Sequence, residues 1–133
     1  MAMNSLKDIY LDQLQDIWSA NTQSLPVVTE LGRAAQDKDL SEALIDGGNG
    51  IYDGLAEIEK LCNEHGIKPN AEHCKGMEGL VKEARVHGLS NDITDPDVRD
   101  AAIIPQYQRM VHYAQAGYGT LAAFANRLGL DTD

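Results

Sequence analysis

Two cysteines and two histidines bracket one short stretch of the sequence: Cys62, His65, His73 and Cys74. Thiolate and imidazole are ligands that zinc prefers, so these residue types could hold a zinc ion. The spacing is unusual for such a site, because His73 and Cys74 are adjacent and their side chains tend to diverge. Cys62 also falls on an apolar stripe where a small core residue is expected. We expect both cysteines to be reduced thiols, and zinc remains the alternative.

A second candidate group centres on His112, which could serve as a metal ligand or an acid–base group if a carboxylate approached it. The carboxylates that could do so are Glu78 and Glu83, on a short predicted helix. A hydrogen-bonded histidine in or beside the core is the simpler role. The sequence has no calcium-loop spacing, phosphate loop, nucleophile elbow or dinucleotide fingerprint.

Aromatic residues and glycines define a third candidate, a cavity. Five residues supply most of the aromatic side-chain volume: Trp18, Tyr52, Tyr107, Tyr113 and Tyr118. They could either pack in the core or line a cavity. The glycines at 47, 48, 50 and 54 allow close approach of a neighbouring backbone or leave room for a bound molecule. Ordinary packing is the simpler explanation, and small-molecule binding is the alternative.

Helices must position these residues. A chain of 133 residues with 43% hydrophobic residues suits one domain, spanning 1–133, with a real core. No obvious segment alternates β-branched or aromatic residues with polar ones over a strand length, whereas apolar spacings of three and four recur. The pattern predicts an all-α fold with three long helices and one short helix.

The first predicted helix follows the cap residue Ser5 and has an apolar face from Leu6 to Leu31. Asn21 and Ser24 lie on that face, and a buried polar side chain needs a partner or a ligand. Pro26 should bend the helix. We expect the exit and turn over 32–38.

A capping box at Asp39 and Glu42 predicts the start of the second helix, and Gly66 its end. The glycines at 47–54 could break this helix, but the apolar spacing keeps its phase across them, so we expect one continuous helix. A short helix over 74–87 should end at Gly88. The last helix should begin at Asp95–Pro96 and run to Leu128, with Pro105 bending its early part.

Charge narrows the range of partners. Eleven basic against 21 acidic residues leave a net charge of -10, which disfavours nucleic acid and anionic membrane surfaces. No run approaches the roughly 18 apolar residues of a spanning helix. The N-terminal residues do not have the pattern of a secretory leader. We expect a cytoplasmic protein.

Five short segments of the sequence carry a family resemblance. They are Leu14 to Ala20, Cys74 to Glu83, Val98 to Ala102, His112 with Tyr113, and Tyr118 to Leu121. Through them the chain resembles the YciF-like family of ferritin-like bacterial stress proteins. The resemblance implies an antiparallel four-helix bundle with one short crossover helix, and a continuous second long helix.

The resemblance also implies a dinuclear metal site formed by inward carboxylates, but this chain departs from that pattern. Asn21 stands where relatives place a glutamate, 49–54 replaces an acid-rich stretch, and Val111 and Ala114 replace acids around His-Tyr. We therefore expect a degenerate site in a stress-associated protein that acts by binding or assembly. The alternative is an oxidoreductase-like iron or manganese protein. Its metal would be bound by Glu78, Glu83 and His112 together with residues from a missing helix or a second protomer.

A further departure is that YciF-like relatives continue into another long helix, which completes the bundle, whereas this sequence stops at Asp133. Three long amphipathic helices without a fourth should expose an apolar groove, filled by another protomer or by the rest of a longer chain. We expect a homo-oligomer.

Overall fold

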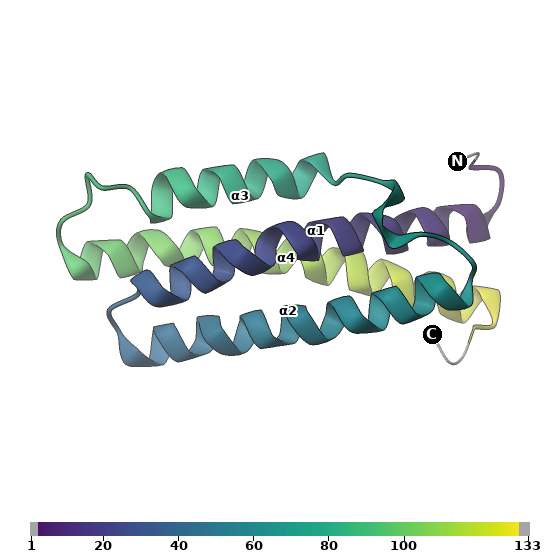
Figure 1. The fold of residues 1–133 in the computed structure, drawn as a ribbon, viewed down its shortest axis with the longest axis horizontal. Coiled ribbons are helices and arrows are strands. Elements are labelled where there is room, and N and C mark those ends of the chain that lie inside the picture. The colour runs from purple at the N-terminus through teal and green to yellow at the C-terminus, as the bar shows by residue number, and fades with distance from the viewer. Residues whose placement is uncertain (1–2, 131–133) are drawn as a thin grey trace.

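The computed structural model describes residues 3–130, which form four α-helices and one short 3-10 helix (Figure 1). The elements are α1 (Leu6–Ala34), α2 (Lys38–Glu64), η1 (Pro69–Ala71), α3 (Lys75–Gly88) and α4 (Pro96–Leu128). This confirms the all-α fold with three long helices and one short one, and no strand occurs between residues 3 and 130. Residues 131–133, to which the prediction about a further helix refers, lie outside the described residues.

The helices form an antiparallel bundle in which α1 contacts α2, α3 and α4. The colours in Figure 1 show that α2 and α4 run in one direction and that α1 and α3 run in the other. The connection through η1 carries the chain from the end of α2 across to the start of α3. No helix in the described part of the chain is long and apolar enough to cross a membrane.

The predicted helix ends are mostly confirmed. Ser5 caps α1 by accepting a hydrogen bond from the Asp8 amide at 3.1 Å. Asp95 caps α4 by accepting from the amides of Asp97 and Val98. Gly129 ends α4 with φ 75°, the left-handed backbone conformation that favours glycine.

The turn between α1 and α2 differs from the prediction. It is confined to 35–37, and the residue that caps α2 is Asp37, whose carboxylate accepts from the Leu40 amide at 2.9 Å. Asp100 of α4 explains why α2 begins before the predicted cap at Asp39. Its carboxylate accepts hydrogen bonds from the amides of Gln36 and Asp37 at 2.7 and 2.9 Å. Asp39 therefore lies inside the first turn of α2.

The core consists of two clusters of buried apolar side chains. One joins the C-terminal half of α1 to α3 and α4 and contains Cys74. The other joins the N-terminal half of α1 to the end of α2 and the end of α4 and contains Cys62. Both thiols are free and buried, as expected of core cysteines. The predicted apolar face of α1 is confirmed and includes Asn21 and Ser24, which are 1% and 3% exposed.

Candidate functional site: a cavity between three long helices

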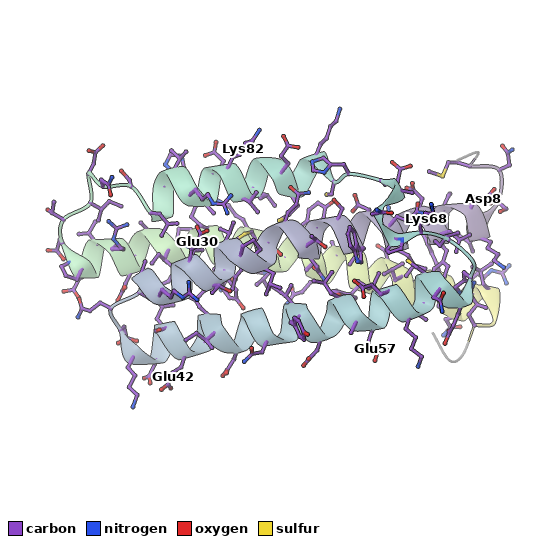
Figure 2. All side chains as sticks on the ribbon, viewed as in Figure 1. Asp8, Glu30, Glu42, Glu57, Lys68 and Lys82 are labelled. Carbon is purple, nitrogen blue, oxygen red and sulfur yellow. The ribbon has the colours of Figure 1, made fainter. Side chains whose placement is uncertain are left out.

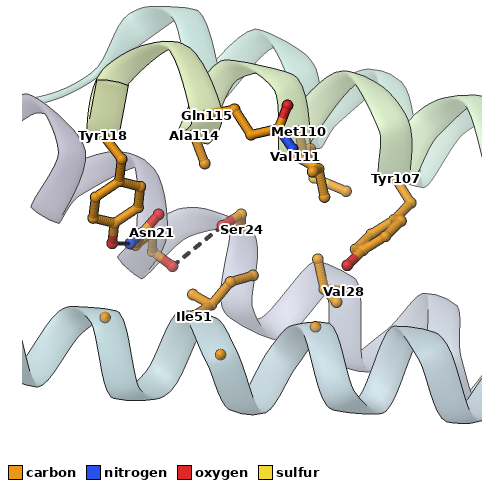
Figure 3. A pocket seen from close by; sticks show the side chains of 13 residues that line it. Asn21, Ser24, Val28, Ile51, Tyr107, Met110, Val111, Ala114, Gln115 and Tyr118 are labelled. Carbon is orange, nitrogen blue, oxygen red and sulfur yellow. Dashed lines mark hydrogen bonds between the residues drawn. The ribbon is translucent and has the colours of Figure 1, made fainter. Parts of the chain in front are cut away.

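A cavity of about 460 Å³ lies between α1, α2 and α4 (Figure 3). Its lining comes from all three helices: Asn21, Ser24 and Val28 of α1; Gly47, Gly50, Ile51 and Gly54 of α2; Tyr107, Met110, Val111, Ala114, Gln115 and Tyr118 of α4. None of these side chains is an acid, a base or a histidine. In a chain with a net charge of -10, this uncharged lining sets the cavity apart from the protein surface.

Two tyrosines of α4 close the ends of the cavity. Figure 3 shows Tyr107 and Tyr118 at opposite ends, each directed from α4 toward α2. The Tyr107 hydroxyl reaches Gly47, and the Tyr118 hydroxyl reaches Gly54. A side chain at either glycine would collide with the tyrosine: a Cβ at Gly54 would lie 2.6 Å from the Tyr118 hydroxyl oxygen. Gly47 and Gly54 are two helical turns apart and so share a face of α2. Close approach of these tyrosines accounts for two of the glycines in the continuous α2 helix.

The polar groups of the cavity gather at the Tyr118 end. The Asn21 amide nitrogen donates a hydrogen bond to the Tyr118 hydroxyl oxygen at 2.6 Å. The Ser24 hydroxyl donates to the Asn21 backbone carbonyl at 3.3 Å (Figure 3). This arrangement gives Asn21, a buried polar side chain on the apolar face of α1, the partner that its burial requires.

Both tyrosines are held in their protonated form. Burial raises the pKa of Tyr107, and burial also raises the pKa of Tyr118, where the hydrogen bond from Asn21 opposes part of the effect. Among the described residues, the Tyr107 hydroxyl has no hydrogen-bond partner. Each hydroxyl can therefore donate its proton to a group inside the cavity.

Gly50 forms an open part of the cavity wall. It is exposed, and a Cβ at this position would meet no heavy atom within 4 Å. Tyr118 separates the cavity from a second hollow of about 300 Å³, which also lies between α2 and α4. That second hollow has a different character, because Glu57, Lys60 and Glu64 contribute charged side chains to its wall. Figure 2 shows Glu57 directed away from the bundle.

The predicted metal ligands are not brought together. His112 is exposed, and one of its ring nitrogens hydrogen-bonds the Gln108 carbonyl of its own helix at 2.7 Å. Glu78 pairs with Lys82 and His73, whose hydrogen bonds lower its pKa. Glu83 pairs with His87 at 2.7 Å. Within residues 3–130 no three His, Cys, Asp or Glu side chains form a group that could hold a metal ion, so a site on Glu78, Glu83 and His112 stays a prediction.

The four residues considered for zinc do not form one group either. Cys62 and Cys74 lie in different core clusters, and the ring of His65 packs edge-on against Tyr10 at 5.7 Å. The Cys74 sulfur lies 2.9 Å from the hydroxyl of Tyr113 and accepts a hydrogen bond from the Met77 amide, so it caps α3. Burial raises the pKa of both thiols, which keeps them protonated.

Of the five aromatic residues considered for a cavity, Tyr107 and Tyr118 line it. Tyr113 points to the other side of α4, where its hydroxyl donates to Asp16 at 2.8 Å. Trp18 donates to Glu59 at 3.0 Å, and Tyr52 is 67% exposed. Other members of the lining, Met110 and Gln115 among them, could not be recognised from the sequence, because nothing distinguishes them from ordinary helical residues.

Comparisons with known proteins agree on one family. The model of the family described as "Domain of unknown function (DUF892)" matches residues 5–133. Protein YciF of Escherichia coli K12 is 32% identical over 130 residues, which cover 97% of this chain and 77% of that protein. Two solved structures superpose with a TM-score of 0.87 at 32% identity: the E. coli stress protein YciF and YcfI of Rhodopseudomonas palustris. This chain covers 81% of each, and they cover 98% and 97% of it.

Proposed function

The chain belongs to the DUF892 family and is YciF-like over most of its length, and from this premise we propose that it acts by binding or assembly rather than by redox turnover. The association with stress comes from the description of E. coli YciF as a stress protein. We place its action in the cytoplasm, where free thiols such as Cys62 and Cys74 persist.

One observation carries the proposal. The positions at which the resemblance to YciF-like proteins implies a departure from a metal-binding pattern lie largely at the cavity. Asn21 comes from α1, Gly50 and Gly54 of the 49–54 stretch from α2, and Val111 and Ala114 from α4. Positions far apart in the sequence thus meet in one uncharged space, which supports a binding site that does not depend on metal.

The chemistry of the lining supports the same conclusion. Iron and manganese ions at dinuclear centres need several carboxylate ligands. The cavity offers amide and hydroxyl groups instead, and the Asn21 nitrogen is engaged with Tyr118. A divalent ion there would lack the negative charge that offsets its loss of hydration.

Assembly is the second part of the proposal, and it concerns the open side of the bundle between α2 and α4. Ile104, Val111 and Tyr118 recur every seven residues along α4 and so share a face. Ile104 and Tyr118 are 46% and 38% exposed. We propose that a second copy of the chain covers this side, which sedimentation over a range of concentrations would detect.

Metal loading tests the proposal. Protein purified without chelator is incubated with iron(II), manganese(II) or zinc(II), desalted and measured by elemental analysis. The expected result is far less than one equivalent of each metal. The triple variant Asn21→Glu, Val111→Glu, Ala114→Glu, which returns acids to three positions, is the positive comparison.

The competing function, a metal centre on Glu78, Glu83 and His112, makes the opposite prediction in the same experiment. Near-stoichiometric iron or manganese in the wild-type protein, lost in His112→Ala, would overturn the proposed function.

A further inference from the structure

We propose that the cavity between Tyr107 and Tyr118 binds a small, uncharged, largely apolar molecule that carries hydrogen-bond acceptor groups. This inference deepens the binding function proposed above and rests on it.

The size and shape of the cavity favour a compact molecule. A volume of about 460 Å³ falls in the range of small-molecule sites in proteins, roughly 300 to 1,000 Å³. The α2–α4 side is not one continuous channel, because Tyr118 reaches Gly54 and separates this cavity from its neighbour. A molecule that fits between the two tyrosines suits this space better than a long helix would.

The lining selects for an uncharged molecule. Val28, Ile51, Met110 and Val111 supply apolar surface from all three helices. No charged side chain lines the cavity, so an ionised ligand group would lose its hydration without gaining a counter-charge. The neighbouring hollow, which Glu57, Lys60 and Glu64 line, shows that the same pair of helices places charged residues elsewhere.

The polar groups select for acceptors on the ligand. The Tyr118 hydroxyl accepts from Asn21 and keeps its own proton to donate. The Tyr107 hydroxyl, at the other end, has no partner among the described residues. A carbonyl or ether oxygen at either end of the ligand would pair with these donors. Gly50, exposed in a single copy of the chain and without a side chain, leaves room for the molecule to enter before a second copy covers this side.

The test uses prodan, an uncharged naphthalene probe with one carbonyl acceptor, whose emission responds to hydrogen bonding. Anilinonaphthalenesulfonate, an anionic naphthalene probe, is the charged comparison. We expect prodan to bind saturably, one molecule per chain, and the anionic probe to bind at least about tenfold more weakly.

Two leucine substitutions locate the probe. Gly50→Leu adds a side chain at the open wall and is expected to weaken prodan binding by about tenfold or more. Gly79→Leu is the matched control: Gly79 is also helical and exposed with nothing within 4 Å, but it lies on α3 away from the cavity. It should bind like the wild type. In the Tyr107→Phe, Tyr118→Phe double variant, the emission of bound prodan should shift to the blue.

The inference is overturned if prodan binds Gly50→Leu as tightly as the wild type, or if the anionic probe binds equally well. It is also overturned if prodan does not bind the wild-type protein. This includes the case in which a second copy of the chain fills the cavity, so that Gly50→Leu dissociates the two copies. Such failures leave the metal measurements untouched, so they are distinguishable from failure of the proposed function, which would appear as bound iron or manganese.

Discussion

The hydroxyl of Tyr118 in α4 lies against the backbone of Gly54 in α2, so closely that a Cβ at Gly54 would be 2.6 Å from it. The same hydroxyl accepts a hydrogen bond from Asn21 of α1 at 2.6 Å. One side chain thus connects the three long helices at one end of the cavity. This contact predicts how substitutions at Gly54 differ from substitutions at Gly50, one turn earlier.

Alanine at Gly50 should stabilise the protein by about 1 kcal/mol, because glycine is a poor helix former and the site is open. Alanine at Gly54 should lack this gain, since Tyr118 must move and its bond with Asn21 is worth about 1 kcal/mol. Urea unfolding of Gly50→Ala and Gly54→Ala measures the difference. Equal stabilisation in both variants would show that the Tyr118 contact imposes no constraint.

Removing the two cavity hydroxyls should have unequal effects. Tyr118→Phe leaves the buried Asn21 amide nitrogen without its acceptor, which costs about 1–3 kcal/mol of the free energy of unfolding. Tyr107→Phe removes a hydroxyl that has no partner among the described residues, so stability should change little. Chemical denaturation of both variants tests this, and a larger loss in Tyr107→Phe would contradict the assigned hydrogen bond.

Alkaline pH should destabilise the protein through Tyr113. Burial, followed by the hydrogen bonds with Cys74 and Asp16, raises its pKa above the ordinary value of 10.0. The unfolded chain therefore releases this proton at a lower pH than the folded protein does. The stability that results is fully present below about pH 10 and falls as the pH rises further.

Unfolding free energies between about pH 8 and pH 11 check the sign. The decline should be steeper in the wild type than in Tyr113→Phe, which lacks the titrating group. Parallel declines in the two proteins would rule out a contribution from Tyr113.

The two thiols should resist modification in the folded protein. Cys62 and Cys74 are 0% and 2% exposed, and burial raises the pKa of each, so little reactive thiolate forms. Reaction with Ellman's reagent should be slow in native buffer and fast in guanidinium chloride. Rapid, stoichiometric reaction of the native protein would contradict this burial.

Local patterns in the sequence predicted most of the fold. The spacing of apolar residues identified all four helices. Its unbroken phase, together with the family resemblance, favoured an α2 helix that continues through its glycines, which the structure confirms. The α2 cap was placed two residues late because Asp37 and Asp39 are both good caps, and the choice depends on Asp100, which is distant in sequence.

The site was harder to predict, because it depends on how each helix is rotated against its neighbours. Asn21 was recognisable as a polar residue on an apolar face, and it does line the cavity. His112 follows Val111 by one residue, about 100° around the helix, and that rotation takes it out to solvent while Val111 faces inward. Likewise, Tyr113 and Tyr118 face different partners, which their spacing alone does not reveal.

Anomalous X-ray scattering at the manganese absorption edge, from crystals grown with manganese(II), tests most directly whether this cavity is an uncharged binding space or a metal centre, because it locates the ion. We expect no manganese peak between Tyr107 and Tyr118. One or two peaks there, within bonding distance of Asn21 or of residues brought by a second copy, would contradict it.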